Sequence, residues 1–159
     1  MTVEEFLAHA IRLEREAADR FDLLADAMET CSNREVARLF RQLADYSRMH
    51  LASARERGGF RDLPDLKHDE FQWPDAESPE VAAIWAADPF VGREEALDIA
   101  LGAETASYEY YKTIWETTDD PEIKVFAKEF TEEESEHVAE LQKWIKAHKA
   151  GQQLPAIGI

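Results

Sequence analysis

Three glutamates and two histidines stand where the surrounding pattern predicts the apolar face of a helix. They are Glu14, His50, Glu104, Glu134 and His137. Glu14 has only alanine and isoleucine three and four positions away on either side, and no cation stands at these spacings from Glu104. A buried carboxylate without a partner costs on the order of several kcal/mol, so each such group needs compensation. Taken singly, each glutamate has an alternative interpretation as a partly exposed residue at the edge of its helix face.

The spacing of these residues predicts that they lie at one depth. In an antiparallel helical hairpin, two residues are level when their numbers average to the centre of the turn. The midpoint of Glu14 and His50 is position 32, and that of Glu104 and Glu134 is position 119, both at expected turns. Glu134 and His137 are three residues apart and therefore share a helix face. We expect all five side chains to converge near the middle of a bundle.

Converging carboxylates and imidazoles form the donor set of a metal ion. Oxygen ligands with some imidazole suit iron, manganese or zinc. Cys31 is the only cysteine, which argues against a structural zinc site, a rubredoxin-type iron centre and a disulfide framework. The sequence thus predicts a metal site with the five residues named above as its ligands.

Glycine and proline, which interrupt helices, cluster in one part of the chain. Residues 2–57 contain neither, and residues 93–150 contain only Gly102 and Pro121. We therefore expect an all-α bundle of two antiparallel hairpins joined by a long crossover. The expected helices are about 3–30, 33–57, 93–118 and 121–149, with a crossover over 58–92, one domain over 1–150 and a C-terminal tail over 151–159.

Three of the expected helix starts carry capping signals. Thr2 with Glu5, and Ser32 with Glu35, have the spacing of capping boxes. A proline directly after Asp120 predicts an N-cap followed by the first helical residue.

These motifs resemble those of the ferritin-like superfamily, most closely rubrerythrin-like proteins that lack a rubredoxin domain. The family site takes one glutamate from each of two helices and a Glu-x-x-His from each of the other two. Glu14 and Glu104 match the single glutamates, each followed by an aromatic residue seven positions later, and Glu134 with His137 matches one Glu-x-x-His. The resemblance implies a ferritin-like four-helix bundle, a di-iron centre of ferroxidase or peroxidase type, a homodimer and an external electron donor.

The second Glu-x-x-His motif is broken in this chain. Ser47 stands three residues before His50, where the family has a glutamate that bridges the metals. The expected site therefore has three carboxylates and two histidines, and should bind its ions more weakly. Asp45 lies about 200° around the helix from Ser47 and is expected to pair with Arg41 instead.

Three functions remain open at this point. The chain is a di-iron oxidoreductase, a metal-binding protein that holds one ion or a labile pair without efficient catalysis, or a structural bundle whose site has decayed. Iron is the expected metal, as two ions or one, with manganese or zinc as alternatives. Tyr108 and Tyr111 flank Glu104 and are expected to donate hydrogen bonds to the ligands.

The composition argues against other classes of function. The chain has 18 Lys and Arg against 34 Asp and Glu, a net charge of −16, which suits neither nucleic acid nor anionic lipid. The start has no secretory pattern, and the longest apolar run, 81–87, is too short to cross a membrane. We therefore expect a cytoplasmic protein.

A few further features carry simpler expectations. The crossover aromatics, among them Phe71 and Trp73, should pack on the bundle or on a second subunit. His9 should be exposed near its helix end, and the acidic stretch 131–136 should be solvated apart from Glu134. The tail is apolar and should dock on the bundle or on a partner.

Overall fold

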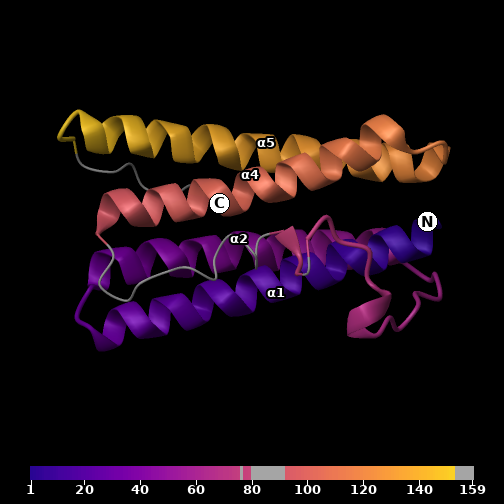
Figure 1. Ribbon diagram of the computed structural model, residues 1–159, viewed down its shortest axis with the longest axis horizontal. Coiled ribbons are helices and arrows are strands. Elements are labelled where there is room, and N and C mark those ends of the chain that lie inside the picture. The colour runs from indigo at the N-terminus through magenta and orange to yellow at the C-terminus, as the bar shows by residue number, and fades with distance from the viewer. Residues whose placement is uncertain (76, 80–91, 153–159) are drawn as a thin grey trace.

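The computed structural model describes residues 1–75, 77–79 and 92–152, which form four long helices and one short 3-10 helix. The helices are α1 (Val3–Thr30), α2 (Arg34–Gly58), η1 (His68–Glu70), α4 (Arg93–Thr117) and α5 (Pro121–Lys149). The α1–α2 hairpin lies against the α4–α5 hairpin, as Figure 1 shows. The predicted all-α four-helix bundle is confirmed, with helix bounds within one residue of those expected. None of the described helices is both long and apolar enough to span a membrane. Residues 153–159 of the tail lie outside the described residues.

Capping interactions fix the start of α1. The Glu5 amide N–H donates to Thr2 Oγ1 at 3.1 Å, and the Thr2 amide N–H donates to Glu5 Oε1 at 3.3 Å. This reciprocal pair is the capping box that the sequence predicts. At the start of α5, the carboxylate of Asp120 accepts the N–H groups of Glu122 and Ile123, so this cap is confirmed as well.

The predicted capping box at Ser32 is wrong. The N-cap residue of α2 is Asn33, and its own amide N–H donates to the carbonyl of Met28 at 2.7 Å, which closes the end of α1. This tight closure puts Ser32 in the left-handed region, with φ 62°, before the second helix begins. The turn is therefore one residue longer than the sequence pattern indicates.

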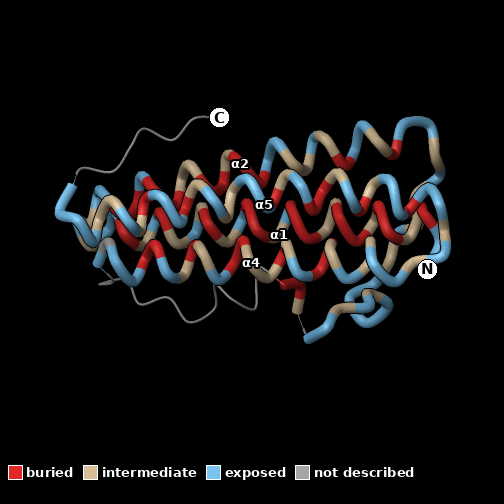
Figure 2. The backbone as a smooth tube through the Cα atoms, turned by 90° about the horizontal axis from the view of Figure 1, so that it is seen from above, coloured by how far each residue is buried: buried red, intermediate tan, exposed pale blue. Residues whose placement is uncertain are grey.

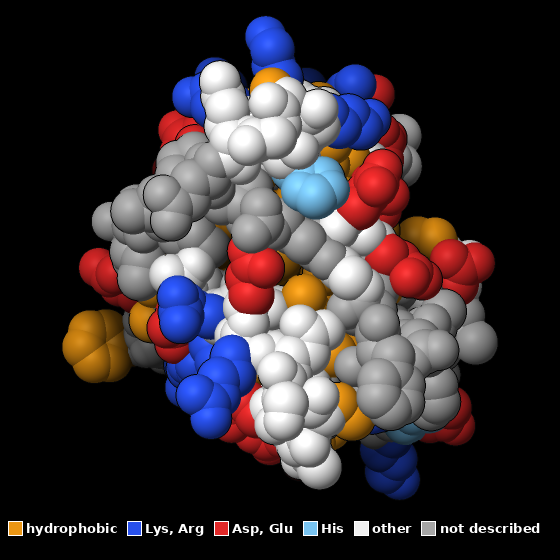
Figure 3. Space-filling view, turned by 90° about the vertical axis from the view of Figure 1, so that its left-hand side faces the viewer, with side chains coloured by type: hydrophobic (Ala, Val, Ile, Leu, Met, Phe, Trp, Pro, Cys, Tyr) orange, Lys and Arg blue, Asp and Glu red, His pale blue; other side chains and the backbone are white. Residues whose placement is uncertain are grey.

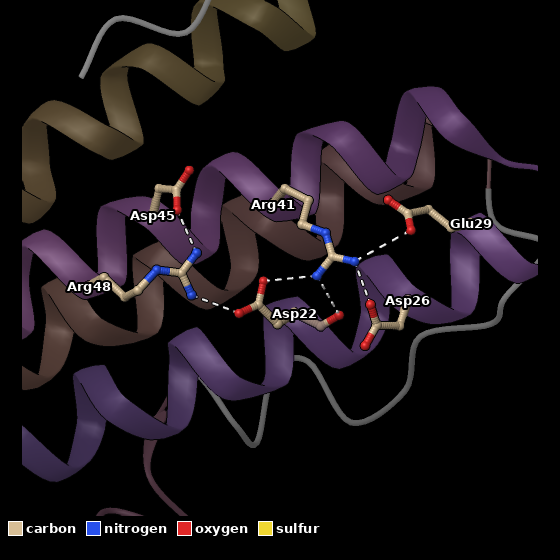
Figure 4. A network of polar contacts seen from close by, with 6 residues as sticks. All are labelled: Asp22, Asp26, Glu29, Arg41, Asp45 and Arg48. Atoms are coloured by element: carbon tan, nitrogen blue, oxygen red, sulfur yellow. Dashed lines mark hydrogen bonds and ion pairs between the residues drawn. The ribbon is translucent and has the colours of Figure 1, made fainter.

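Charged side chains join the two helices of the first hairpin on their outer face (Figure 4). Arg41 of α2 contacts three acidic residues of α1, namely Asp22, Asp26 and Glu29. Asp45 pairs with Arg48, three residues along its own helix, and not with Arg41 as expected. The reason is that the guanidinium of Arg41 reaches across to α1, where three acceptors compete for it. Figure 3 views the end of the bundle that carries the α1–α2 turn and shows side chains of both charges there.

The crossover packs onto α1 around His9, which is only 1% exposed, so its expected exposure is wrong. Its Nδ1–H donates to the carbonyl of Glu5 at 2.7 Å, and its Nε2 accepts the amide N–H of Gln72 at 2.8 Å. The rings of Phe71 and Trp73 lie 5.0 and 4.9 Å from the imidazole, centroid to centroid. Crossover residues thus cover the helix end that the sequence leaves open, and a neutral imidazole satisfies both hydrogen bonds.

We expect His9 to make stability depend on pH. Burial lowers the pKa of His9 below its usual 6.5, so the folded protein keeps the ring neutral while the unfolded chain protonates it. Its stabilising contribution is therefore complete above about pH 6.5 and is lost as the pH falls below that value. Urea unfolding of the His9→Gln variant should show a smaller loss of unfolding free energy between about pH 7.5 and about pH 5 than the wild type. The control is His68→Gln, at an exposed histidine, and equal pH slopes for the wild type and His9→Gln would refute the prediction.

Candidate metal centre

A layer of polar side chains divides the hydrophobic core into two clusters along the bundle. Figure 2 shows that buried residues run the length of the helices. On α1, Leu13 belongs to one cluster, Ala17 belongs to the other, and Glu14 stands between them. The same interruption occurs on the other three helices, at Ser47 and His50 of α2, Glu104 of α4, and Glu134 and His137 of α5. Each helix therefore contributes polar groups at the same depth.

The carboxylates of this layer point inward. Glu14 and Glu104 are 2% exposed and Glu134 is 1% exposed. The side chains of His50 and His137 are 13% and 17% exposed, so each imidazole has one edge near solvent. The structure therefore brings together all five residues that the sequence singles out.

The imidazoles make the close contacts within the layer. His50 Nδ1 lies 3.0 Å from Glu134 Oε1 and 3.4 Å from Glu14 Oε1. His137 Nδ1 lies 3.6 Å from Glu104 Oε2, beyond hydrogen-bond distance. The two imidazole rings stack with centroids 4.7 Å apart and planes 7° from parallel. Residues of four helices thus meet within a few ångströms of one another.

Two of the five residues singled out by the sequence have a buried polar atom without a hydrogen-bond partner among the described residues. Glu134 Oε2 and His137 Nδ1 are buried and have no hydrogen-bond partner among the described residues. Buried polar groups are rarely left without one, so these atoms call for an explanation. Ligand atoms of His50, Glu134 and His137 all lie within 4.8 Å of one another. Carboxylate oxygen with imidazole nitrogen is a donor set that fits a divalent metal ion such as iron.

The close approach of several carboxylates shifts the pKa values of groups in the layer. Burial alone would lower the pKa of His50, but Glu14, Glu104 and Glu133 outweigh it and raise that pKa to about 9. Burial, reinforced by Glu104 and Glu14, raises the pKa of Glu134 well above the usual value for a carboxyl group. The layer therefore attracts positive charge, and the imidazolium of His50 supplies some of it.

The two tyrosines expected to support the ligands differ in their surroundings. The hydroxyl of Tyr111, a residue that is 1% exposed, donates a hydrogen bond to Glu14 Oε1 at 3.3 Å. Tyr108 is half-buried, and the ammonium of Lys112 lies 5.7 Å from the centroid of its ring. Within the described part of the chain, only Tyr111 of the pair has a hydrogen bond to a carboxylate of this layer.

Glu133 is an additional acidic group at this layer, and its expected full solvation is wrong. Its side chain is 34% exposed, but its Oε2 is buried 3.8 Å from the Nε2 of His50, whose imidazole reaches it from α2. A groove of about 490 Å³ lies beside it, lined by Tyr46, Met49, His50, Ser53, Glu133, Glu136, His137 and Glu140. The neighbour test that selects Glu14 does not select Glu133, because the residues three and four positions away are Glu129, Phe130, Glu136 and His137 and not an apolar set.

Comparison with known proteins agrees with this geometry. The family model described as Rubrerythrin matches residues 5–145. A crystal structure of an uncharacterised conserved protein from Magnetospirillum magnetotacticum MS-1 is 36% identical, with a TM-score of 0.70. The match covers 99% of this chain and 100% of that one. No curated protein matches the sequence.

We expect the crowding of carboxylates to destabilise the metal-free protein. Glu134→Gln keeps the shape of the side chain and removes the burial cost and the repulsion from Glu14 and Glu104. With chelator present near pH 7, urea unfolding should show that this variant is more stable than the wild type by about 1 kcal/mol. Glu132→Gln, at an exposed position of the same helix, should change stability by less than about 0.5 kcal/mol. A clear loss of stability in Glu134→Gln would contradict this account.

Proposed function

Because the chain belongs to the rubrerythrin family, we propose that it binds iron at mid-bundle and acts as a di-iron oxidoreductase. One observation carries the proposal: donor atoms of His50, Glu134 and His137 lie within 4.8 Å of one another. Two of these residues, Glu134 and His137, also have buried polar atoms without hydrogen-bond partners among the described residues. A metal ion would satisfy those atoms and compensate the charge of the buried carboxylates.

The proposed ligands are the five residues of the polar layer: Glu14, His50, Glu104, Glu134 and His137. Bound iron would supply electron transfer to peroxide or dioxygen, in ferroxidase or peroxidase fashion. The hydroxyl of Tyr111 orients the carboxylate of Glu14 through its hydrogen bond. The two hydrophobic clusters on either side of the layer limit access of water. An external donor would return electrons to the centre.

Ser47 favours a second candidate function. This serine is 2% exposed and lies on α2 one turn before His50, so the layer has a neutral hydroxyl where the related sites have a bridging carboxylate. Serine is a weak ligand without charge, and its presence lowers the affinity for a second cation. The alternative is therefore a protein that holds one ion, or a labile pair, without efficient catalysis.

The iron content of three variants, each compared with the wild type, tests the ligand assignment. After loading with ferrous iron under nitrogen, elemental analysis of Glu134→Ala should show loss of most of the bound iron, because this residue is the most deeply buried ligand. Ser47→Glu should hold more iron than the wild type, since it restores a fourth carboxylate. Glu132→Ala, on the exposed side of α5, is the matched control and should retain the wild-type content.

The stoichiometry separates the candidate functions. Near two ions per chain, as in a di-iron site, together with peroxide-dependent oxidation would support the oxidoreductase. Near one ion per chain without turnover would support the binding protein. No bound iron would contradict the assignment of the site. A Ser47→Glu variant with wild-type stoichiometry and wild-type affinity for iron would contradict the role given to the missing carboxylate.

A further inference from the structure

Glu133 is a partly buried carboxylate that the ligand set leaves without a role. It precedes Glu134 on α5, and two-thirds of its side chain is covered, since 34% is exposed. Its Oε2 is buried and has no hydrogen-bond partner among the described residues. The basic atom facing this oxygen is His50 Nε2, at 3.8 Å. An acidic side chain that served only for solubility would have no reason to be placed in this way.

The two ring nitrogens of His50 face opposite carboxylates. Nδ1 points into the bundle, 3.0 Å from Glu134 Oε1 and 3.4 Å from Glu14 Oε1. Nε2 points toward Glu133. An imidazole that binds a metal through one nitrogen usually donates the N–H of the other to a carboxylate, which fixes its tautomer and its orientation. For His50, an ion among the inner carboxylates would take Nδ1 and leave Nε2–H for Glu133.

We propose that Glu133 is the positioning residue for His50, accepting its Nε2–H so that the Nδ1 lone pair faces the metal. In this role Glu133 also places a fourth negative charge beside the centre, and so offsets in part the carboxylate that is missing at Ser47. The inference rests on the proposed metal binding. This role for Glu133 would explain how His50 can still bind a metal although the Glu-x-x-His motif on α2 lacks its glutamate.

The neighbouring charged residues do not offer the same interaction. Arg57, about two helical turns after His50 on α2, is bonded at 2.9 Å to Glu129, which lies about one turn before Glu133 on α5. Glu136 lines the same groove as Glu133 but is exposed to solvent. Glu133 is therefore left to His50, and Glu136 provides a matched control of equal charge on the same helix.

The test measures zinc binding and the tautomer of His50 in the full chain. Zinc suits both calorimetry and nitrogen NMR because it is diamagnetic and has no redox chemistry. Removing such a carboxylate partner should weaken metal binding by about tenfold in Glu133→Ala, whereas Glu136→Ala should stay within about twofold of the wild type. Glu133→Gln, which keeps an acceptor but loses the charge, should fall between them. In the zinc-loaded wild type, His50 should show a protonated Nε2 that exchanges slowly with solvent, and this protection should be lost in Glu133→Ala.

Each other outcome would overturn the proposal in a distinguishable way. Wild-type affinity and an unchanged Nε2–H signal in Glu133→Ala would overturn the role of Glu133 while leaving the metal site intact. Loss of one whole ion from the stoichiometry in both Glu133 variants would make this residue a direct ligand instead. A wild-type chain that binds no zinc and no ferrous iron would overturn both the proposed function and this inference. Helix content from circular dichroism, expected to be unchanged, excludes misfolding of the variants as the cause.

Discussion

Three carboxylates in the interior of one helix bundle create a charge that has to be compensated, and the middle of this protein is organised by that requirement. Glu14, Glu104 and Glu134 are all at most 2% exposed, and the basic groups within reach are the imidazoles of His50 and His137. Such an arrangement does not favour the folding of the bare chain. Hydrocarbon side chains at the same positions would pack at lower cost. The cost is understandable if the layer exists to hold a cation.

The rest of the fold serves to keep this layer in place. Hydrophobic clusters on both sides hold the four helices at fixed spacing, and the polar residues fall at one depth on every helix. Arg41 and Arg48 connect α1 to α2 along the outside of the first hairpin. Phe71 and Trp73 of the crossover pack on His9 and cover one end of α1. The residues proposed as ligands therefore lie on long helices rather than on loops.

The sequence predicts the helices and the polar layer well because both depend on local periodicity. Glycine and proline mark the breaks, and the hairpin midpoints place Glu14 level with His50 from the residue numbers alone. Contacts between segments that are distant in the sequence are harder to predict from it. The burial of His9 depends on a crossover residue 63 positions away, Gln72, and no local pattern predicts such a pair. Ser32 fails as a cap because the end of the preceding helix decides the turn.

In the candidate site too, features of a single helix can be predicted from the sequence, whereas contacts between helices cannot. The inward-facing side chains proposed as ligands follow from the helix faces on which they lie, but the role proposed for Glu133 depends on the imidazole of His50 reaching it from α2. An acidic run such as 131–136 predicts a solvated surface, and only the packing of the helices shows that one member turns toward a histidine. Ser47 is visible in the sequence as a departure from the family motif, whereas the position of Glu133, which we propose offsets it in part, is visible only in three dimensions.

Anomalous diffraction at the iron edge, from crystals grown with ferrous iron under nitrogen, tests the central claim most directly. We predict a strong peak between the four helices, at bonding distance from His50, Glu134 and His137. A bundle interior without a peak, with His50 still paired to Glu134 and iron only at surface carboxylates, would contradict the claim.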